Sequence, residues 1–246
     1  MMESCSLPWS SYAGRPLPWW AVHLLNNSAI VVLLACGDHL LLKSWLAARG
    51  VAQHQLDNAR WFWLHAIANF FVCCTALTSV WATLTDPIGA LDGRSHSDLS
   101  FFGDASLWPL TIINSVHVYH MIGQFELSGA DYFHHLVFVP ALGFPGQVYR
   151  WGSLGNMMAF FISGLPGGLD YLLLGCQKLG LVDHLFEKQA SANLNTWLRV
   201  PGILFTSTLL YQATLLGNHA SVQEGGPPSW ALALQIILPP HAGGHF

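Results

Sequence analysis

The chain has 246 residues, of which 52% are hydrophobic and only 9% are charged, whereas an ordinary soluble domain has about 25% charged residues. This composition excludes a typical soluble protein and predicts an all-α, polytopic membrane protein whose tryptophans anchor it at the interfaces. The formal net charge is −4, so nothing suggests a nucleic-acid partner. We expect a single membrane domain over residues 1–246.

A membrane-spanning helix needs about 20 mostly apolar residues. Two early runs have this length, Trp20–Leu42 and Trp61–Leu84, and a polar loop, Thr85–Asp104, follows them. Four further spans are predicted at Leu107–Leu127, Tyr132–Tyr149, Leu154–Leu174 and Trp197–Leu216. A shorter run, Trp230–Leu238, could form part of a seventh. The sequence therefore predicts six or seven transmembrane helices.

Two of these spans contain helix-breaking residues. The fourth carries Pro140 and Pro145 and is expected to be kinked. The fifth is predicted to be interrupted at residues 164–168, Gly-Leu-Pro-Gly-Gly, just before Asp170. Broken helices at membrane depth are tolerated where they line a cavity or pack against protein, which favours a functional or network role for Asp170.

Basic residues give the predicted orientation, because cytoplasmic loops carry an excess of Lys and Arg. One side of the membrane is assigned Lys43, Arg49, Arg60, Lys178, Lys188 and Arg199, and the other only Arg15, Arg94 and Arg150. The loop between the first two spans is therefore expected to be cytoplasmic.

Four histidines and one aspartate lie close together in the third and fourth spans. His117 and His120 are three residues apart and share one face of a helix. His134 and His135 follow Asp131 at the start of the next span. Ionisable groups at membrane depth usually face a cavity or a partner, so we expect the chemistry here. The alternative is that these residues only pack and cap helices.

Further polar residues are predicted to contribute to the same interior and to contact substrate: His65, Asn114, Tyr119 and Asn156, together with His117 and His120. No resident cofactor and no metal site is expected. The histidines and one acid could hold one zinc ion at most. A membrane di-iron hydroxylase would need about eight histidines in three boxes, and two metal ions need more ligands than this chain offers.

Histidine beside a carboxylate in a water-poor cavity is typical of general-base or nucleophilic catalysis. No phosphate-binding loop, nucleophilic-serine elbow or dinucleotide fingerprint occurs in the sequence. In a membrane enzyme the natural substrates are then a long acyl chain, delivered as a thioester, and a lipid acceptor. The predicted partners are membrane lipids and long-chain acyl-CoA, with a homodimer left open.

Two segments resemble the TLC-domain superfamily, which includes ceramide synthases and lipid-homeostasis proteins. They are residues 131–135, Asp-Tyr-Phe-His-His, and residues 164–171, Gly-Leu-Pro-Gly-Gly-Leu-Asp-Tyr. The resemblance covers approximately residues 55–217. The long acidic segment that follows the double histidine in ceramide synthases is absent from this chain.

The resemblance implies a helical barrel around a lipid-sized cavity and an acyl-CoA-dependent acyltransferase of the endoplasmic reticulum, if the protein is eukaryotic. His134 or His135 would be the base or nucleophile, and Asp170 or Asp131 would orient its imidazole. His117 and His120 would position the thioester or the acceptor.

Two alternatives stay open. Residues 117–120, His-Val-Tyr-His, resemble the start of the histidine box of fatty-acid elongases, although Met121 stands where that box has a further histidine. The first alternative is therefore an elongase-like condensing enzyme. The second is a lipid sensor without catalytic activity, because a fold does not fix a function. If the histidines converge on an open cavity, an enzyme is favoured. If their hydrogen bonds are made to one another, a structural role is favoured.

Overall fold

The computed structural model describes residues 11–12, 15–16, 18–52, 55–92, 96–123, 125–148 and 151–216. Apart from two short paired strands, β1 (Ser11–Tyr12) and β2 (Arg15–Pro16), the regular structure of these residues is helical. The predicted all-α class is thereby confirmed.

Among these residues, three helices are long and apolar enough to cross a membrane. The first, Trp20–Ala48, combines α1 (Trp19–Cys36), η1 (Gly37–Leu42) and α2 (Lys43–Ala48). The second is α3 (Leu56–Thr85). The third, Gly152–Lys178, combines α8 (Gly152–Ala159), η4 (Phe160–Gly164) and α9 (Leu165–Lys178). They correspond to the first, second and fifth predicted spans.

The other predicted spans also coincide with helical structure. The third is α5 (Trp108–Ile122), and the fourth is a run of α6 (Gly129–Phe133), η3 (His134–Gly143) and α7 (Phe144–Val148). The sixth is the end of a longer run formed by α10 (His184–Leu194), η5 (Asn195–Arg199) and α11 (Val200–Leu216). The seventh, Trp230–Leu238, lies outside the described residues. The predicted loop Thr85–Asp104 contains a short helix, α4 (Pro87–Leu91).

The predicted break in the fifth span is wrong, because the helix continues from Gly152 to Lys178. A wider π-helical turn, η4, lies immediately before α9 and connects it to α8 without a break. Pro166 then falls in the first turn of α9, where its missing N–H is tolerated. Pro140 is similarly accommodated inside the π-helical segment η3.

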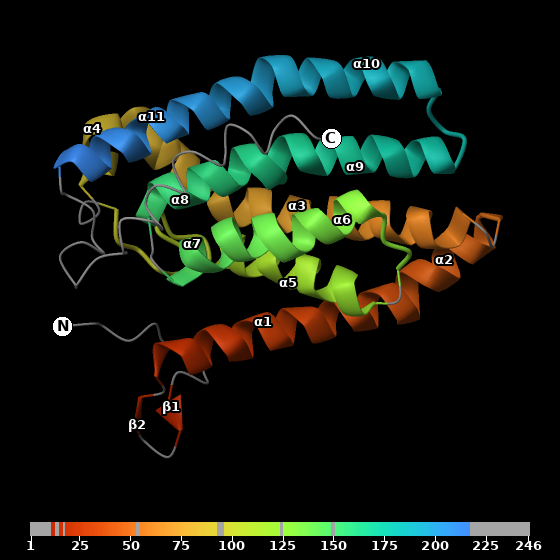
Figure 1. Ribbon diagram of the computed structural model, residues 1–246, viewed down its shortest axis with the longest axis horizontal. Coiled ribbons are helices and arrows are strands. Elements are labelled where there is room, and N and C mark those ends of the chain that lie inside the picture. The colour runs from red at the N-terminus through yellow and green to blue at the C-terminus, as the bar shows by residue number, and fades with distance from the viewer. Residues whose placement is uncertain are drawn as a thin grey trace.

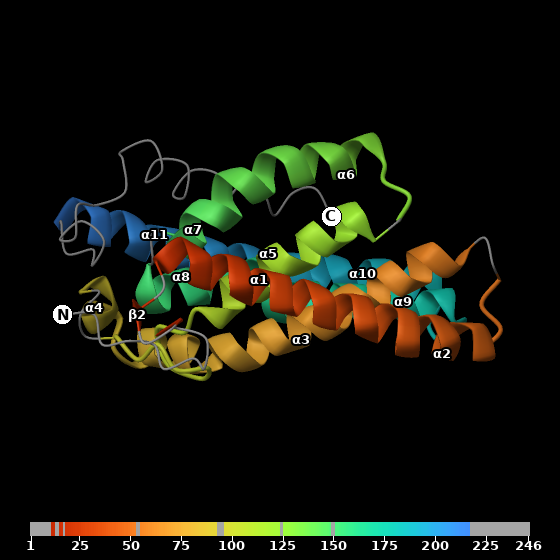
Figure 2. The ribbon, with the colours of Figure 1, turned by 90° about the horizontal axis from the view of Figure 1, so that it is seen from below.

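The helices form an elongated bundle around α3 (Figure 1). The α1–α2 rod lies along one side of the bundle, and the α10–α11 rod lies along the opposite side (Figure 1). Seen from below, the α6–α7 run stands apart at the edge of the bundle (Figure 2). One apolar core joins η1 and α2 to α3, α5 and α8, and a second joins α4, α8 and α11.

A buried ion pair and a hydrogen bond to it join η1, α3 and α5. Arg60 of α3 donates from Nε and Nη2 to the carboxylate of Asp38 in η1, at 2.9 and 2.5 Å. The Tyr119 hydroxyl of α5 donates to the same carboxylate at 2.7 Å. Arg60 and Arg199 are both buried, so two of the six charges assigned to the cytoplasmic side are interior charges and say nothing about loop orientation.

Candidate functional site

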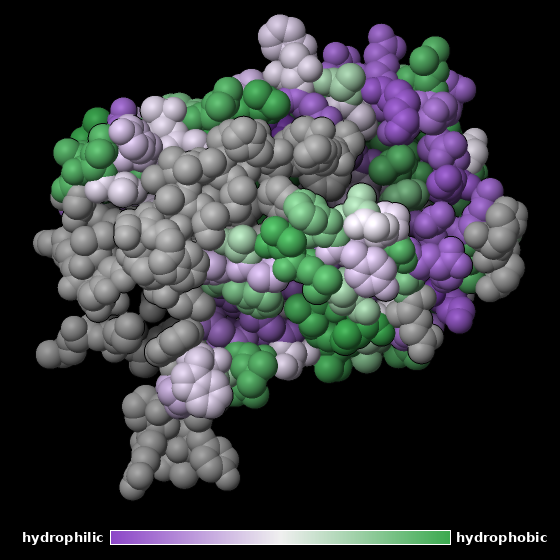
Figure 3. All heavy atoms as spheres, in the orientation of Figure 1, coloured by the Kyte–Doolittle hydropathy of each residue, from purple (hydrophilic) through white to green (hydrophobic). Residues whose placement is uncertain are grey.

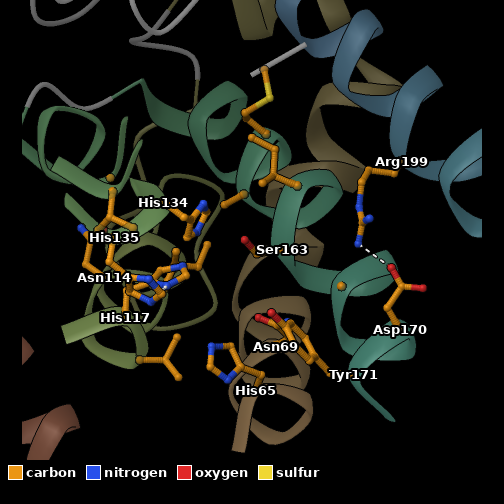
Figure 4. Close-up of a pocket in the computed structure, with 18 of the residues that line it drawn as sticks. His65, Asn69, Asn114, His117, His134, His135, Ser163, Asp170, Tyr171 and Arg199 are labelled. Carbon is orange, nitrogen blue, oxygen red and sulfur yellow. Dashed lines mark hydrogen bonds and ion pairs between the residues drawn. The ribbon is translucent and has the colours of Figure 1, made fainter. Parts of the chain in front are cut away.

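A cavity of about 1030 Å³ lies between α3, α5, the α6–α7 run, the α8–α9 helix and the α10–α11 rod (Figure 4). Many of its lining residues are apolar, including Leu110, Val139 and Leu174. Its polar lining residues are His65, Asn69, Asn114, His117, Asp131, His134, His135, Ser163, Asp170, Tyr171, Glu187, Lys188, Ser191, Asn195 and Arg199.

Histidines from α5 and η3 form one wall of this cavity, which we call the histidine wall: His117, His134 and His135. The His135 Nε2 atom lies 3.3 Å from His117 Nδ1 and 2.9 Å from Nδ1 of the buried His120. The rings of His134 and His117 lie 5.1 Å apart, centre to centre. The structure thus brings the two predicted histidine clusters together.

The hydrogen bonds of His135 fix its tautomer. Its Nδ1 atom lies 2.6 Å from the main-chain oxygen of Asp131, and a carbonyl oxygen can only accept, so Nδ1 carries the proton. In a neutral ring Nε2 then has the lone pair. It accepts from the neighbouring histidines, with the shorter distance, 2.9 Å, to His120.

His65 and His120 extend the group of rings away from the wall. His65 stands 5.6 Å from His120 and 4.7 Å from Tyr171, centre to centre. His120 is 1% exposed and lies against Trp61, with their ring centres 3.7 Å apart. His120 itself is absent from the cavity lining, whereas its neighbours Trp61, His65 and His135 belong to it.

Asp170 lies on the opposite wall from the histidines (Figure 4). Its carboxylate accepts from Arg199 Nη2 and from the Ser191 hydroxyl, each at 2.8 Å. Arg199 also donates to the side chain of Asn195. The prediction that Asp170 lines the cavity agrees with the structure, but its carboxylate is held by Arg199 and Ser191 instead of orienting an imidazole.

Asp131 also acts differently from the prediction. Its carboxylate accepts from the main-chain N–H and the hydroxyl of Ser128, at 2.7 and 2.6 Å, which caps α6. It is the main-chain oxygen of Asp131 that orients His135. This helix-capping role was the competing interpretation of an aspartate at a helix start.

Three predicted substrate-contacting residues have separate surroundings. Asn114 lines the cavity and donates to Gln147 at 2.7 Å. Tyr119 belongs to the ion pair of Asp38 instead. Asn156 donates to the Ser79 hydroxyl and to the Ser106 main-chain oxygen, at 3.0 and 2.9 Å, and is absent from the cavity lining.

Arg199, Ser191 and Ser163 were missed as site residues. A signal for Arg199 existed in the sequence, since an arginine at the start of an apolar run requires a partner at membrane depth. Ser163 and Ser191 carry no such signal, because serine is common in membrane helices.

Within the described part of the chain, no group of three or more His, Cys, Asp or Glu residues is arranged to hold a metal ion. The chain matches no protein-family model, no curated protein and no solved structure.

Proposed function

We propose that the helices form six membrane spans with the loop after α2 on the cytoplasmic side. The bundle supports this arrangement, because the connection after α2 and the turn between α9 and α10 lie at the same end of the molecule (Figure 1). Hydrophilic side chains gather on this end (Figure 3). Lys43, Arg49, Lys178 and Lys188 are the remaining basic residues assigned to it.

We further propose that the protein is a TLC-like enzyme of lipid metabolism that transfers a long acyl group from acyl-CoA to a lipid acceptor. One observation carries the proposal: a cavity of about 1030 Å³ has a histidine wall on one side and many apolar residues around it. Ligand sites are typically apolar cavities of about 300–1,000 Å³ with a few convergent polar groups. A long acyl chain suits this combination.

In the proposed reaction, His134 takes the proton from the amine or hydroxyl of the acceptor. The acceptor attacks the carbonyl carbon of the thioester, an acyl–acceptor bond forms, and the C–S bond breaks. The proton then passes to the departing CoA sulfur. His117 lies beside His134 and positions the thioester, while His135, held by the Asp131 main-chain oxygen, fixes the wall.

Acyl transfer from palmitoyl-CoA to a panel of sphingoid and lysolipid acceptors, with purified protein, tests the proposal. General acid–base catalysis contributes about 10²–10⁴-fold in rate, so His134→Ala should lower kcat by that factor. Mass spectrometry of the wild type should show no acylated histidine, because the acceptor attacks the thioester directly; a covalently acylated histidine would mean that the histidine is the nucleophile instead. Unchanged activity in both His134→Ala and His135→Ala, or the absence of any acylated product, would contradict the proposal.

A lipid sensor is the second candidate, and a specific observation favours it. His120 and His135 are hydrogen-bonded to each other at 2.9 Å, so part of the cluster is satisfied internally. Lipid that co-purifies with the protein, combined with no acyl transfer to any acceptor, would replace the enzyme proposal with this one. An elongase-type condensation would instead yield a β-keto product from malonyl-CoA.

A further inference from the structure

Asn69 and Ser163 lie in the middle of the cavity, between the histidine wall and the Asp170–Arg199 pair (Figure 4). Asn69 belongs to α3 and is only 4% exposed, and Ser163 belongs to η4. Neither side chain makes a hydrogen bond with another residue in the part of the chain that the structure describes. Both are therefore available to a bound molecule.

The hydroxyl of Ser163 differs from those of three other Ser and Thr residues in these helices. Thr75, Thr111 and Ser115 each donate to the main-chain oxygen four residues earlier, at 2.7–2.8 Å. This bond is the usual partner of Ser and Thr within a helix. Ser163 lies in the π-helical turn η4, a feature that is frequent at functional sites, and its hydroxyl keeps its donor for the cavity.

Asn69 is held against α9 by two glycines. A Cβ atom added at Gly167 would lie 3.2 Å from Asn69 Nδ2, and one added at Gly168 would lie 3.2 Å from Asn69 Cβ. Glycines at such positions allow two helices to approach closely. The carboxamide is thus confined to the cavity wall. A ligand in the cavity can accept its hydrogen bond.

We propose that the Asn69 amide and the Ser163 hydroxyl form a subsite for the carbonyl oxygen of the acyl thioester. This inference rests on the proposed acyl transfer. Attack on the carbonyl carbon moves the C=O electron pair onto the oxygen, and its return expels the CoA sulfur. Two neutral donors would stabilise the negative oxygen between these steps, as in oxyanion holes built from Asn and Ser side chains. The histidine wall would approach the same carbonyl from the other side.

Kinetics on the full-length protein with palmitoyl-CoA test the subsite. Removal of one oxyanion donor costs about 10²–10³-fold in kcat, so Asn69→Leu and Ser163→Ala should each lower kcat by about 10²-fold. Ser163→Thr keeps the hydroxyl and should keep kcat near that of the wild type. Thermal unfolding should be little changed in Ser163→Ala, since its hydroxyl has no partner among the described residues.

Ser207→Ala is the matched control. Ser207 is a buried serine of α11 whose hydroxyl also makes no hydrogen bond within the described structure, but it does not line the cavity. Its replacement should leave kcat unchanged. An equal loss of kcat in Ser207→Ala and Ser163→Ala would overturn the subsite, because the effect would then not depend on contact with the cavity.

A binding measurement separates this inference from the proposed function. The wild type should bind palmitoyl-CoA about tenfold more tightly than its thioether analogue S-hexadecyl-CoA, which lacks the carbonyl; a factor of ten corresponds to about 1.4 kcal/mol. Asn69→Leu and Ser163→Ala should lose this preference. If it is lost while the wild type acylates no acceptor, the subsite stands and the enzyme proposal falls. If both variants keep the preference and kcat, the subsite falls.

Discussion

Asp38 has no exposed surface, and three donor atoms from two other helices converge on its carboxylate. Arg60 in turn lies over the ring of Phe125, 4.9 Å from its centre, and also contacts Asp57. A charge removed from solvent in this way is stable only while its partners are in place.

Replacement of Arg60 by methionine should therefore destabilise the protein by about 3–5 kcal/mol, because Asp38 would stay buried without its cation. Chemical unfolding in detergent measures the effect. Lys43→Met is the control, since Lys43 is exposed in α2, and its loss should stay within about 0.5 kcal/mol. Equal stability of the two variants would contradict a structural role for the ion pair.

Tyr119 belongs to the same network and provides a separate test. Tyr119→Phe removes one hydrogen bond to the Asp38 carboxylate, which should cost about 1.5–3 kcal/mol of stability. The KM for palmitoyl-CoA should stay unchanged, because the ring does not line the cavity. A raised KM with unchanged stability would return Tyr119 to the substrate site, as the sequence predicted.

At the same scale, the sequence predicts individual polar residues better than their partners. Asp170 stands out as an acid in an apolar run, and the structure places it in the cavity wall. Its partner Arg199 lies 29 positions later, and Asp38 and Arg60 are 22 positions apart. Such pairs depend on which helix faces become neighbours, and no local pattern encodes this.

Helix α11 packs closely against the π-helical segment η4 at one glycine, Gly202. A Cβ atom added at Gly202 would lie 2.2 Å from Cδ1 of Phe161, closer than any real contact. Small residues at such crossings let helices approach in the absence of a hydrophobic driving force between them.

Gly202→Ala should consequently destabilise the bundle by about 1–3 kcal/mol, the usual cost of overpacking. Gly37→Ala is the matched control, because a Cβ added there meets no atom within 4 Å and the backbone has helical angles, φ −60° and ψ −43°. It should be neutral or stabilise by up to about 1 kcal/mol. Thermal unfolding of both variants decides the matter, and a neutral Gly202→Ala would mean that the crossing is looser than described.

At the scale of elements, hydropathy predicts where helices lie but not where an α-helix changes to a π-helical turn. The Pro-Gly-Gly sequence at residues 166–168 suggests a break, yet η4 and α9 form one helix with α8. A proline can be accommodated when a π-turn precedes it and the proline, which lacks an N–H, falls in a first turn. The proline alone cannot distinguish this arrangement from an interruption.

The whole molecule places its connections alternately at two ends of the bundle. The connection after α2 and the α9–α10 turn share one end, and α4 lies at the other (Figure 1). Among the described residues, three helices meet the length and hydropathy of membrane spans. The other three spans, Leu107–Leu127, Tyr132–Tyr149 and Trp197–Leu216, are predicted from their apolar sequence runs. Their crossing of the bilayer is a prediction that labelling can test.

Cysteine labelling in sealed, oriented vesicles provides that test, in a variant whose five native cysteines are replaced by alanine. Arg49→Cys and Leu181→Cys introduce thiols at exposed positions at one end of the bundle, and Ser97→Cys introduces one in the loop after α4. Six spans require that a membrane-impermeant maleimide reach the first two only from the cytoplasmic side and Ser97→Cys only from the opposite side. If Leu181→Cys and Arg49→Cys were labelled from opposite sides, an odd number of crossings would separate them. The cavity would then have to be formed by a bundle with fewer spans, because either the α5 helix or the α6–α7 run would lie on the membrane surface.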